Sequence, residues 1–319
     1  MTTGPDEQPM SMTDPAASPE RIEALTYSLR RALGDTTLTV RPWRQGVDFW
    51  ADRTQAGGQA AVLRSPRHEF VETSYEGVVD FGDVIEREVT ALGLMSAAGL
   101  PVPSVLGWQR GEPGVPPWVL LAHVEHDDDP HVPLRQLGEL TRRVHDIRPQ
   151  LPGLEPAGDW ATLMCDRLFQ RLGAARAYCS LPADHDLKAG IAELLRPRHS
   201  HATSLLHMDL RAANLCVREG RIAAIIDVAN CMVGDPLLEL GRIRRYGLLD
   251  DQFLGGYGLD VHRLGPDELT LLDIYELDTA ALLTVVAVEE IDDAPMHAEQ
   301  AAWTEYLASR IAQRMAAAR

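Results

Sequence analysis

The pattern of apolar and polar positions divides the chain into a first third of short strands and a remainder that is mostly helical. In the first third, short apolar runs alternate with turn residues, which is typical of strands. These runs predict strands at residues 36–42, 48–52, 59–63, 104–108 and 118–121. The Ala-Gly-Gly turn at 56–58 suits a hairpin between the second and third strands. We therefore expect a small sheet of about five strands.

Two helices accompany these strands. Ser18 is a capping residue followed by proline and glutamate, so a helix should begin there and run to about Leu33. Residues 83–98 carry apolar side chains at helical spacing and end before Gly99, a residue typical of helix C-termini. Between these helices, residues 65–82 form a long polar connection without a clear period, which predicts a mobile loop.

The character of the chain changes after a polar stretch at 122–133 that is rich in Asp and His and resembles a linker. Beyond it, the spacing predicts helices at 134–147, 160–178, 184–195, 236–246, 266–290 and 298–318. We expect an α+β fold with two lobes, an N-terminal lobe at 18–123 and a C-terminal lobe at 124–319, after a disordered tail at 1–17.

One hairpin interrupts the helical part. Its apolar runs, 215–217 and 222–226, flank a turn at Glu219-Gly220. Asp209 and Asn214 precede its first strand, and Asp227 stands at the exit of its second strand. Hard cations such as Mg²⁺ prefer oxygen ligands of this kind, and phosphoryl transfer needs both a metal clamp and a carboxylate for the attacking hydroxyl. The pattern therefore favours chemistry on a phosphate.

Composition narrows the possible partners. The formal net charge of −17 disfavours a nucleic-acid binder, which would show a basic stripe. It is compatible with a cationic substrate, and equally with an acidic surface that only aids solubility. The four cysteines have no metal-binding spacing and are expected to be reduced thiols. Lys188 is the only lysine, so a catalytic cation elsewhere must be arginine or histidine.

Localisation is predicted from absences in the sequence. No run approaches the roughly 18 apolar residues of a membrane span. The first residues lack the basic end and apolar core of a signal peptide, so we expect a cytoplasmic protein.

The hairpin region also resembles a known family. The spacing His207-x-Asp209-x-x-x-x-Asn214, then Asp227 and a Gly-Asp-Pro at 234–236, resembles the catalytic and metal segment of the aminoglycoside phosphotransferase family. The members of this family look like small relatives of protein kinases. Further matches follow in the family's order upstream, at residues 61–64, 85–89, 99–103, 118–123, 136–140 and 144–145. The resemblance covers about 41–258 and implies a bilobal, protein-kinase-like fold with a small sheet lobe and a larger helical lobe.

The resemblance also implies roles for individual residues. Asp209 would be the catalytic carboxylate, and Asn214 and Asp227 would hold Mg²⁺. Arg64 would contact the phosphates of ATP, or of GTP as an alternative, and would be oriented by Glu88. The remaining nucleotide contacts would come from a covering loop and from the hinge, at Gly46, Leu121, His123 and Val124.

Several alternatives stay open. Arg64 and Glu88 could be ordinary charges, His207 is expected to brace the loop, and Asp235 could simply cap the following helix. Three positions depart from the family's pattern: Met208 stands where glycine is common, Ala212-Ala213 replace Pro-Gly, and Val228 replaces an aromatic residue.

The acceptor is the least defined part. Asp273, Glu276 and Asp278 on one expected helix, with further acids at 289–293, could bind ammonium groups, or could form an exposed acidic helix face. The resemblance implies an ATP-dependent O-phosphotransferase acting on a small molecule, with an antibiotic as the leading acceptor. The alternatives are a sugar or amino-alcohol kinase and a catalytically silent nucleotide-binding regulator. We expect neither nucleic acid nor membrane as a partner.

Overall fold

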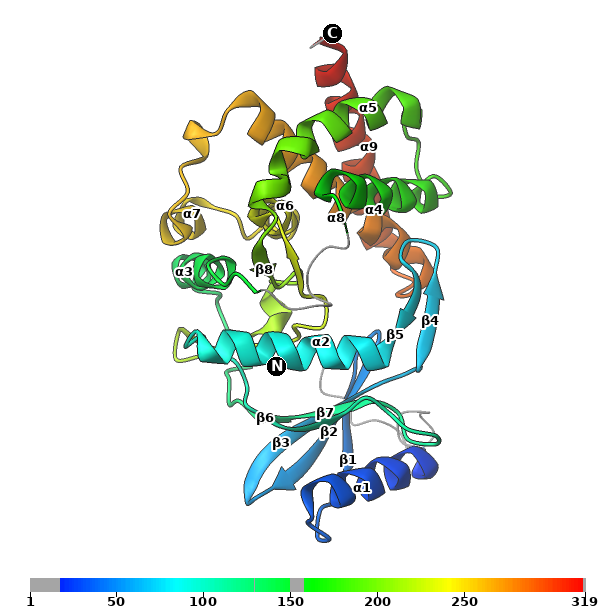
Figure 1. The fold of residues 1–319 in the computed structure, drawn as a ribbon, viewed down its shortest axis with the longest axis vertical. Helices are drawn as coiled ribbons and strands as arrows, with labels where there is room; N and C mark the ends of the chain where they lie inside the picture. Colours follow the sequence, from blue (N-terminus) through cyan, green and yellow to red (C-terminus); the bar gives the residue numbers. More distant parts are fainter. Residues whose placement is uncertain (1–17, 129, 150–157, 318–319) are drawn as a thin grey trace. The chain divides into compact units, whose positions relative to one another are not determined.

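The structure, a computed structural model, describes residues 18–317 apart from residue 129 and residues 150–157 (Figure 1). The expected disordered tail at 1–17 lies outside the described residues. The chain forms two compact units. Of the described residues, the first unit contains 18–71, 79–93 and 103–124, and the second contains 72–78, 94–102 and those from 125 to 317.

The first unit is built on one antiparallel sheet of five strands in the order β1-β2-β3-β7-β6. The strands are β1 (Arg41–Gln45), β2 (Phe49–Ala56), β3 (Gln59–Pro66), β6 (Val105–Gln109) and β7 (Trp118–Ala122). The expected five-stranded sheet and the tight turn between β2 and β3 are confirmed. The first strand begins at Arg41 rather than at residue 36, because Leu38 and Val40 pack into the core without pairing with a neighbouring strand.

Helix α1 (Pro19–Leu33) completes the core of this unit. The Oγ atom of Ser18 accepts the N–H of Arg21 at 3.2 Å, and the helix ends at Gly34 with a φ of +66°. Its Leu25 and Leu29 pack with Leu63 of the sheet. Helix α2 (Phe81–Ala97) begins two residues earlier than expected.

The connection at 65–82 was predicted to be a loop without regular structure, and the structure corrects this. After β3 it forms a hairpin of β4 (Phe70–Thr73) and β5 (Gly77–Asp80). The hairpin tip belongs to the second unit, where Ser74 donates to Glu289 and Tyr75 donates to Glu290. These partners lie 215 residues away in the chain, so no local pattern could indicate them.

The second unit is mainly helical. Its helices are α3 (Leu134–His145), α4 (Trp160–Ala175), α5 (Asp184–Leu195), α6 (Pro236–Arg245), α7 (Asp251–Tyr257), α8 (Pro266–Glu289) and α9 (Ala294–Ala317). Short 3₁₀ turns occur at η2 (Arg196–His201), η3 (Ala212–Asn214) and η4 (Val261–Arg263). The six expected helices are present, α9 begins four residues earlier, and α7 was missed. Helices α8 and α9 run side by side at the orange-to-red end of the chain (Figure 1).

Two short strand pairs lie among these helices. β9 (Leu215–Arg218) and β10 (Arg221–Ile225) form the predicted hairpin, with positive φ angles at Glu219 and Gly220. β8 (Ser204–Leu206) pairs with β11 (Met232–Gly234), a pair that the sequence analysis did not predict. None of the described helices is long and apolar enough to span a membrane.

Candidate active site

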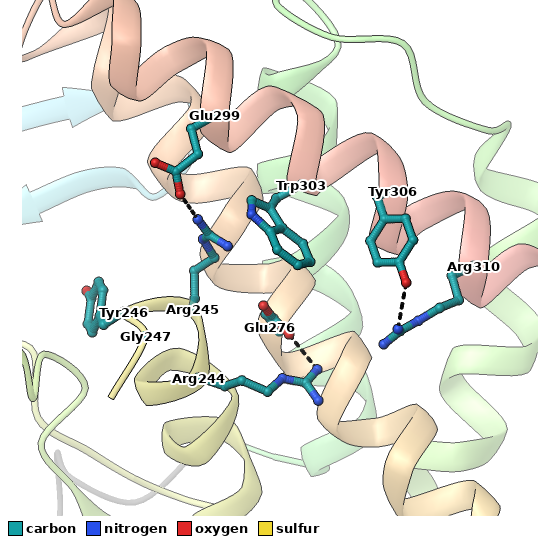
Figure 2. Close-up of a pocket in the computed structure, with 9 residues that line it drawn as sticks. All are labelled: Arg244, Arg245, Tyr246, Gly247, Glu276, Glu299, Trp303, Tyr306 and Arg310. Carbon is teal, nitrogen blue, oxygen red and sulfur yellow. Dashed lines mark hydrogen bonds and ion pairs between the residues drawn. The ribbon is translucent and has the colours of Figure 1, made fainter. Parts of the chain in front are cut away.

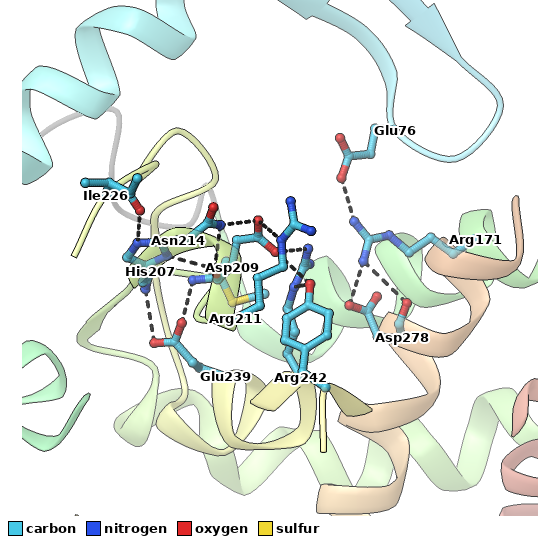
Figure 3. Close-up of polar contacts among 12 residues, drawn as sticks. Glu76, Arg171, His207, Asp209, Arg211, Asn214, Ile226, Glu239, Arg242 and Asp278 are labelled. Atoms are coloured by element: carbon cyan, nitrogen blue, oxygen red, sulfur yellow. Dashed lines mark hydrogen bonds and ion pairs between the residues drawn. The ribbon is translucent and has the colours of Figure 1, made fainter. Parts of the chain in front are cut away.

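The loop between β8 and η3 is held by His207. Its Nε2 atom donates to the carbonyl of Ile226 at 3.0 Å, and its Nδ1 atom accepts the N–H of Asp209 at 3.2 Å. One ring nitrogen therefore donates while the other accepts, which is the pattern of a neutral imidazole. These contacts tie the loop to the exit of β10, so His207 braces the loop as expected (Figure 3).

Glu239 of α6 is a second brace, which the sequence analysis missed. Its buried carboxylate accepts the backbone N–H of His207 at 3.1 Å and that of Met208 at 2.6 Å, and it contacts Nε2 of His145 at 2.8 Å. Burial opposes ionisation, but the hydrogen bond and charge of His145 lower the pKa of Glu239 below its ordinary value. The signal in the sequence was an acid in the first turn of the helix after Gly-Asp-Pro.

Asp209 projects from this braced loop and is nearly buried. Its Oδ1 atom accepts the hydroxyl of Tyr246 at 2.6 Å and lies 3.4 Å from Nη2 of Arg242. Its Oδ2 atom accepts Nδ2 of Asn214 at 2.6 Å and Nε of Arg211 at 3.1 Å. Burial would raise the pKa of Asp209, but the charges of Arg242 and Arg211 and the Tyr246 hydrogen bond outweigh it and lower the pKa to about 2. Asp209 is therefore an oriented carboxylate.

Tyr246 is a second missed residue at this site. Burial, the largest effect, raises the pKa of its hydroxyl to about 12, so the group keeps its proton and acts as a donor to Asp209. Tyr246 immediately follows α6, and its place beside Asp209 depends on how that helix packs.

Asn214 and Asp227 are brought together by the hairpin. The N–H of Ile226 donates to the carbonyl of Asn214 at 3.0 Å, which places Asp227 beside the residue that precedes β9. Nδ2 of Asn214 donates to Asp209, so its amide oxygen is the atom left to serve as a ligand. Within the described residues there is no cluster of three or more His, Cys, Asp or Glu side chains suited to a metal ion. An amide oxygen and a carboxylate fit Mg²⁺, which commonly takes its other ligands from water and substrate phosphates.

The Gly-Asp-Pro segment is structural. Asp235 is buried and caps α6 by accepting the N–H of Leu237 at 3.1 Å. Arg198 also donates to both of its oxygens, at 2.6 and 2.7 Å. A Cβ atom at Gly234 would lie 2.7 Å from the ring of Trp160, so glycine is required there for close packing.

In the first unit, Arg64 and Glu88 form the expected pair. Arg64 lies in β3, between Ala51 and Val119 of the neighbouring strands, and donates to the buried carboxylate of Glu88 in α2. Its guanidinium also lies over the ring of Phe49, 4.5 Å from the centroid. Strand β3 and helix α2 thus fix the orientation of the Arg64 side chain.

Comparison with known sequences identifies the family. The sequence model of the phosphotransferase enzyme family, abbreviated APH, matches residues 39–272. The chain belongs to this family. It is therefore a small-molecule kinase, an enzyme that uses a nucleotide to phosphorylate a small molecule. No curated protein sequence matches the phosphotransferase.

Solved structures share the fold at low sequence identity. The macrolide 2′-phosphotransferase MphH from Brachybacterium faecium is 19% identical, with a TM-score of 0.55 over 90% of this chain and 98% of that chain. The GDP complex of an aminoglycoside 2′-phosphotransferase of type IIIa is 14% identical, with a TM-score of 0.60 over 91% of this chain and 98% of that chain. A protein from Haemophilus somnus, provisionally assigned as a fructosamine-3-kinase, is 14% identical, with a TM-score of 0.60 over 91% of this chain and 97% of that chain.

Three of the other nucleotide residues expected for the phosphotransferase, Gly46, Leu121 and His123, are paired through their backbone. Leu121 is buried in β7, and His123 just after it donates its N–H to Ala60 at 2.9 Å, while Val124 is half-buried. Gly46 is exposed, and its N–H closes the turn between β1 and β2 on the carbonyl of Phe49 at 2.7 Å. His123 therefore already uses its N–H within the sheet.

The acids expected at the acceptor site of the phosphotransferase are not exposed. Asp273, Glu276 and Asp278 are buried in α8. Asp273 contacts Arg244, Arg310 and Arg314, Glu276 contacts Arg244, and Asp278 contacts Arg167 and Arg171. The alternative of an exposed acidic helix face is therefore wrong for these three residues, while the further acids Glu289, Glu290 and Asp292 are exposed. Binding of ammonium groups by any of these acids stays a prediction. Helix α8 is apolar on most of its surface and buried, so its acids need arginine partners.

Proposed function

We propose that this phosphotransferase transfers the terminal phosphate of ATP to a hydroxyl group of a small molecule, with GTP as the alternative donor to test. The observation that carries the proposal is the braced, nearly buried carboxylate of Asp209 beside Asn214 and Asp227. Phosphoryl transfer requires little covalent chemistry from the protein and depends on positioning and charge. The braced loop would supply the positioning, and the oxygen ligands would hold the metal ion that offsets the charge.

Asp209 would orient the attacking hydroxyl and accept its proton as the bond to phosphorus forms. Both of its oxygens accept hydrogen bonds from neighbouring side chains, which fix the direction of the carboxylate. Asn214 and Asp227 would hold Mg²⁺, which when bound offsets the charge that develops on the phosphates. Arg64, held by Glu88, would contact the nucleotide phosphates.

The leading acceptor is an antibiotic, which would make the protein a resistance kinase of the cytoplasm. Aminoglycoside and macrolide phosphotransferases among the similar structures support this choice. A metabolite kinase is the second candidate, because the Haemophilus somnus protein carries a sugar-amine kinase assignment. A silent nucleotide-binding regulator is less well supported, because Asp209, Asn214 and Asp227 are all present and held in one loop and hairpin.

The proposal is tested by incubating the protein with Mg-ATP and a panel of antibiotics and hydroxylated metabolites. ATP consumption and an added phosphate, detected by mass spectrometry, identify an acceptor. We expect turnover with at least one acceptor and none when Mg²⁺ is chelated. ATP binding without phosphate transfer to any acceptor would support the regulator instead.

A further inference from the structure

A pocket in the second unit lies at the end of α6, against α8 and α9 (Figure 2). Its cavity volume is about 540 Å³, which is large enough for a drug-sized molecule. Arg244 and Arg245 line it from α6, and Trp303, Tyr306 and Arg310 line it from α9. The pocket is thus rich in arginines in a chain with a formal net charge of −17.

The arginines of this pocket have unused hydrogen-bond donors. Nη2 of Arg244 contacts Glu276 at 2.5 Å and Asp273 at 2.7 Å, and Arg245 contacts Glu299 and Gln300. A guanidinium carries five N–H donors, so these contacts use only part of each group. Among the described residues, the Nε atoms of Arg244 and Arg310 are buried without a hydrogen-bond partner, so the donors open to a ligand are the Nη groups of these half-buried side chains.

Each carboxylate near the pocket is paired with at least one arginine. Oδ1 of Asp273 is contacted by Arg244 and Arg310, and its Oδ2 is contacted by Arg314 at 2.6 Å. The acids of this cluster are Asp273, Glu276 and Glu299. The arginines are Arg244, Arg245, Arg310 and Arg314. Three negative and four positive charges leave one net positive charge. The side chain of Glu299 is 60% exposed, so an ammonium group can reach this one acid, but the surplus arginine favours an anion, which can accept from guanidinium N–H groups outside these ion pairs.

Two aromatic side chains form one wall of the pocket. Trp303 and Tyr306 are 38% and 50% exposed, and their rings meet edge to face with centroids 5.5 Å apart. Arg245 lies over the Trp303 ring, 4.9 Å from its centroid, and Nη1 of Arg310 donates to the Tyr306 hydroxyl at 3.0 Å (Figure 2). Exposed aromatic surface beside oriented arginines suits a flat apolar group that carries an anion.

The pocket is connected to the catalytic carboxylate by one residue. Tyr246 lines the pocket, and its hydroxyl donates to Oδ1 of Asp209 at 2.6 Å. A molecule in the pocket therefore lies within one side chain of the group that would receive the attacking hydroxyl.

We propose that this pocket binds the acceptor, and that the acceptor is a hydroxylated molecule with a flat apolar part and an anionic group, a carboxylate or a phosphate ester. The anion contacts Arg244 and Arg310, and the flat part lies against Trp303 and Tyr306. Its role as the acceptor site depends on the proposed phosphotransfer function, but the binding itself does not. A polycationic acceptor fits this pocket poorly.

The test uses four probes that share a ring and a hydroxymethyl group: para-hydroxymethyl benzoate, para-hydroxymethyl phenyl phosphate, para-hydroxymethyl benzamide and para-hydroxymethyl benzylamine. Binding is measured by calorimetry or ligand-observed NMR on the full chain without nucleotide. The variants are Arg310→Gln and Trp303→Ala, with Arg263→Gln as the control because Arg263 is 86% exposed and outside the pocket. Asp273 keeps Arg244 and Arg314 in the Arg310→Gln variant, and thermal melting checks its fold.

We expect the benzoate and the phosphate to bind at least about tenfold more tightly than the benzylamine, with the benzamide between them. Arg310→Gln and Trp303→Ala should each weaken benzoate binding by about tenfold or more, while Arg263→Gln leaves it unchanged. Equal or tighter binding of the benzylamine, or no benzoate binding up to about 10 mM, overturns the proposal. Because no nucleotide is present, these results are independent of the phosphotransfer assay, whose failure would count against the proposed function alone.

Discussion

The carboxylate of Glu239 accepts the backbone N–H of Met208 at 2.6 Å, and Met208 has a φ of +65°. A left-handed conformation disfavours any residue with a Cβ atom, so this hydrogen bond holds a strained position directly before Asp209. Glycine is common here in the family that the sequence resembles. In this chain methionine takes the position, and its side chain is buried.

This conformation predicts an unusual order of stability for two variants. Met208→Ala and Met208→Gly both lose the buried side chain, at a cost of about 2–5 kcal/mol. Only glycine relieves the left-handed strain, so Met208→Gly should be more stable than Met208→Ala by about 1 kcal/mol. Urea unfolding of both variants measures the difference. Greater stability of the alanine variant would contradict the strained conformation.

Asp209→Asn should lower turnover by about 100-fold or more while nucleotide binding and fold survive, because the amide cannot accept the hydroxyl proton. Steady-state kinetics with an identified acceptor provide the measurement. Asp251→Asn, an exposed aspartate at the start of α7, is the matched control and should leave the rate unchanged. Equal rates for the Asp209→Asn variant and the wild type would remove Asp209 from the mechanism.

Asp227→Ala should abolish magnesium-dependent nucleotide binding, because it removes the carboxylate of the proposed metal ligands. The experiment compares ATP affinity with and without Mg²⁺ by calorimetry, using Asp251→Ala as the control. Tight ATP binding that still requires Mg²⁺ in the Asp227→Ala variant would show that the metal ligands lie elsewhere.

Arg64→Lys tests the nucleotide contact in the first unit. Lysine keeps a charge next to the buried Glu88 but loses the planar fork that matches a phosphate. We expect the KM for ATP to rise by about threefold to tenfold, with kcat changing less. Arg53→Lys, on the neighbouring strand β2, is the control. An unchanged KM for ATP would mean that Arg64 serves the fold alone.

Asp278 predicts a pH dependence of stability. Burial would raise the pKa of its carboxyl, but Arg167 and Arg171 overcome this effect and hold the pKa below its ordinary value. The unfolded chain therefore takes up the proton first as the pH falls. The stabilisation is present above about pH 4 and is lost below it.

The measurement is the free energy of unfolding in urea between neutral pH and about pH 3. Asp278→Asn should be destabilised by about 3 kcal/mol at neutral pH, because buried Arg171 loses a partner, and its deficit relative to the wild type should shrink as the pH falls. Asp267→Asn, at an exposed position of the same helix, should track the wild type at every pH. A deficit for Asp278→Asn that grows at low pH would refute the assignment.

Much of the architecture was predictable because its signals are local. Ser18 caps α1, and Asp235 with Pro236 begins α6. The turn at Glu219-Gly220 closes the β9–β10 hairpin within a few residues of each strand. Residues 70–80 carry no such local signal. The tip of their hairpin is held by contacts with α8 and α4, which are distant in the sequence.

The amino-acid sequence by itself determined the family, and with it the kind of reaction, because the spacing of Asp209, Asn214 and Asp227 brings three oxygen-bearing side chains to one loop and hairpin. Only the tertiary structure decided the surroundings. Glu239 and Tyr246 reach the loop because α6 packs beside it, and the acids of α8 are buried against arginines up to 111 residues away in the sequence. The physical reason is that most charged side chains are exposed, so a sequence does not mark the few that are buried. Only the packing of the helices shows which charges are buried and must be paired.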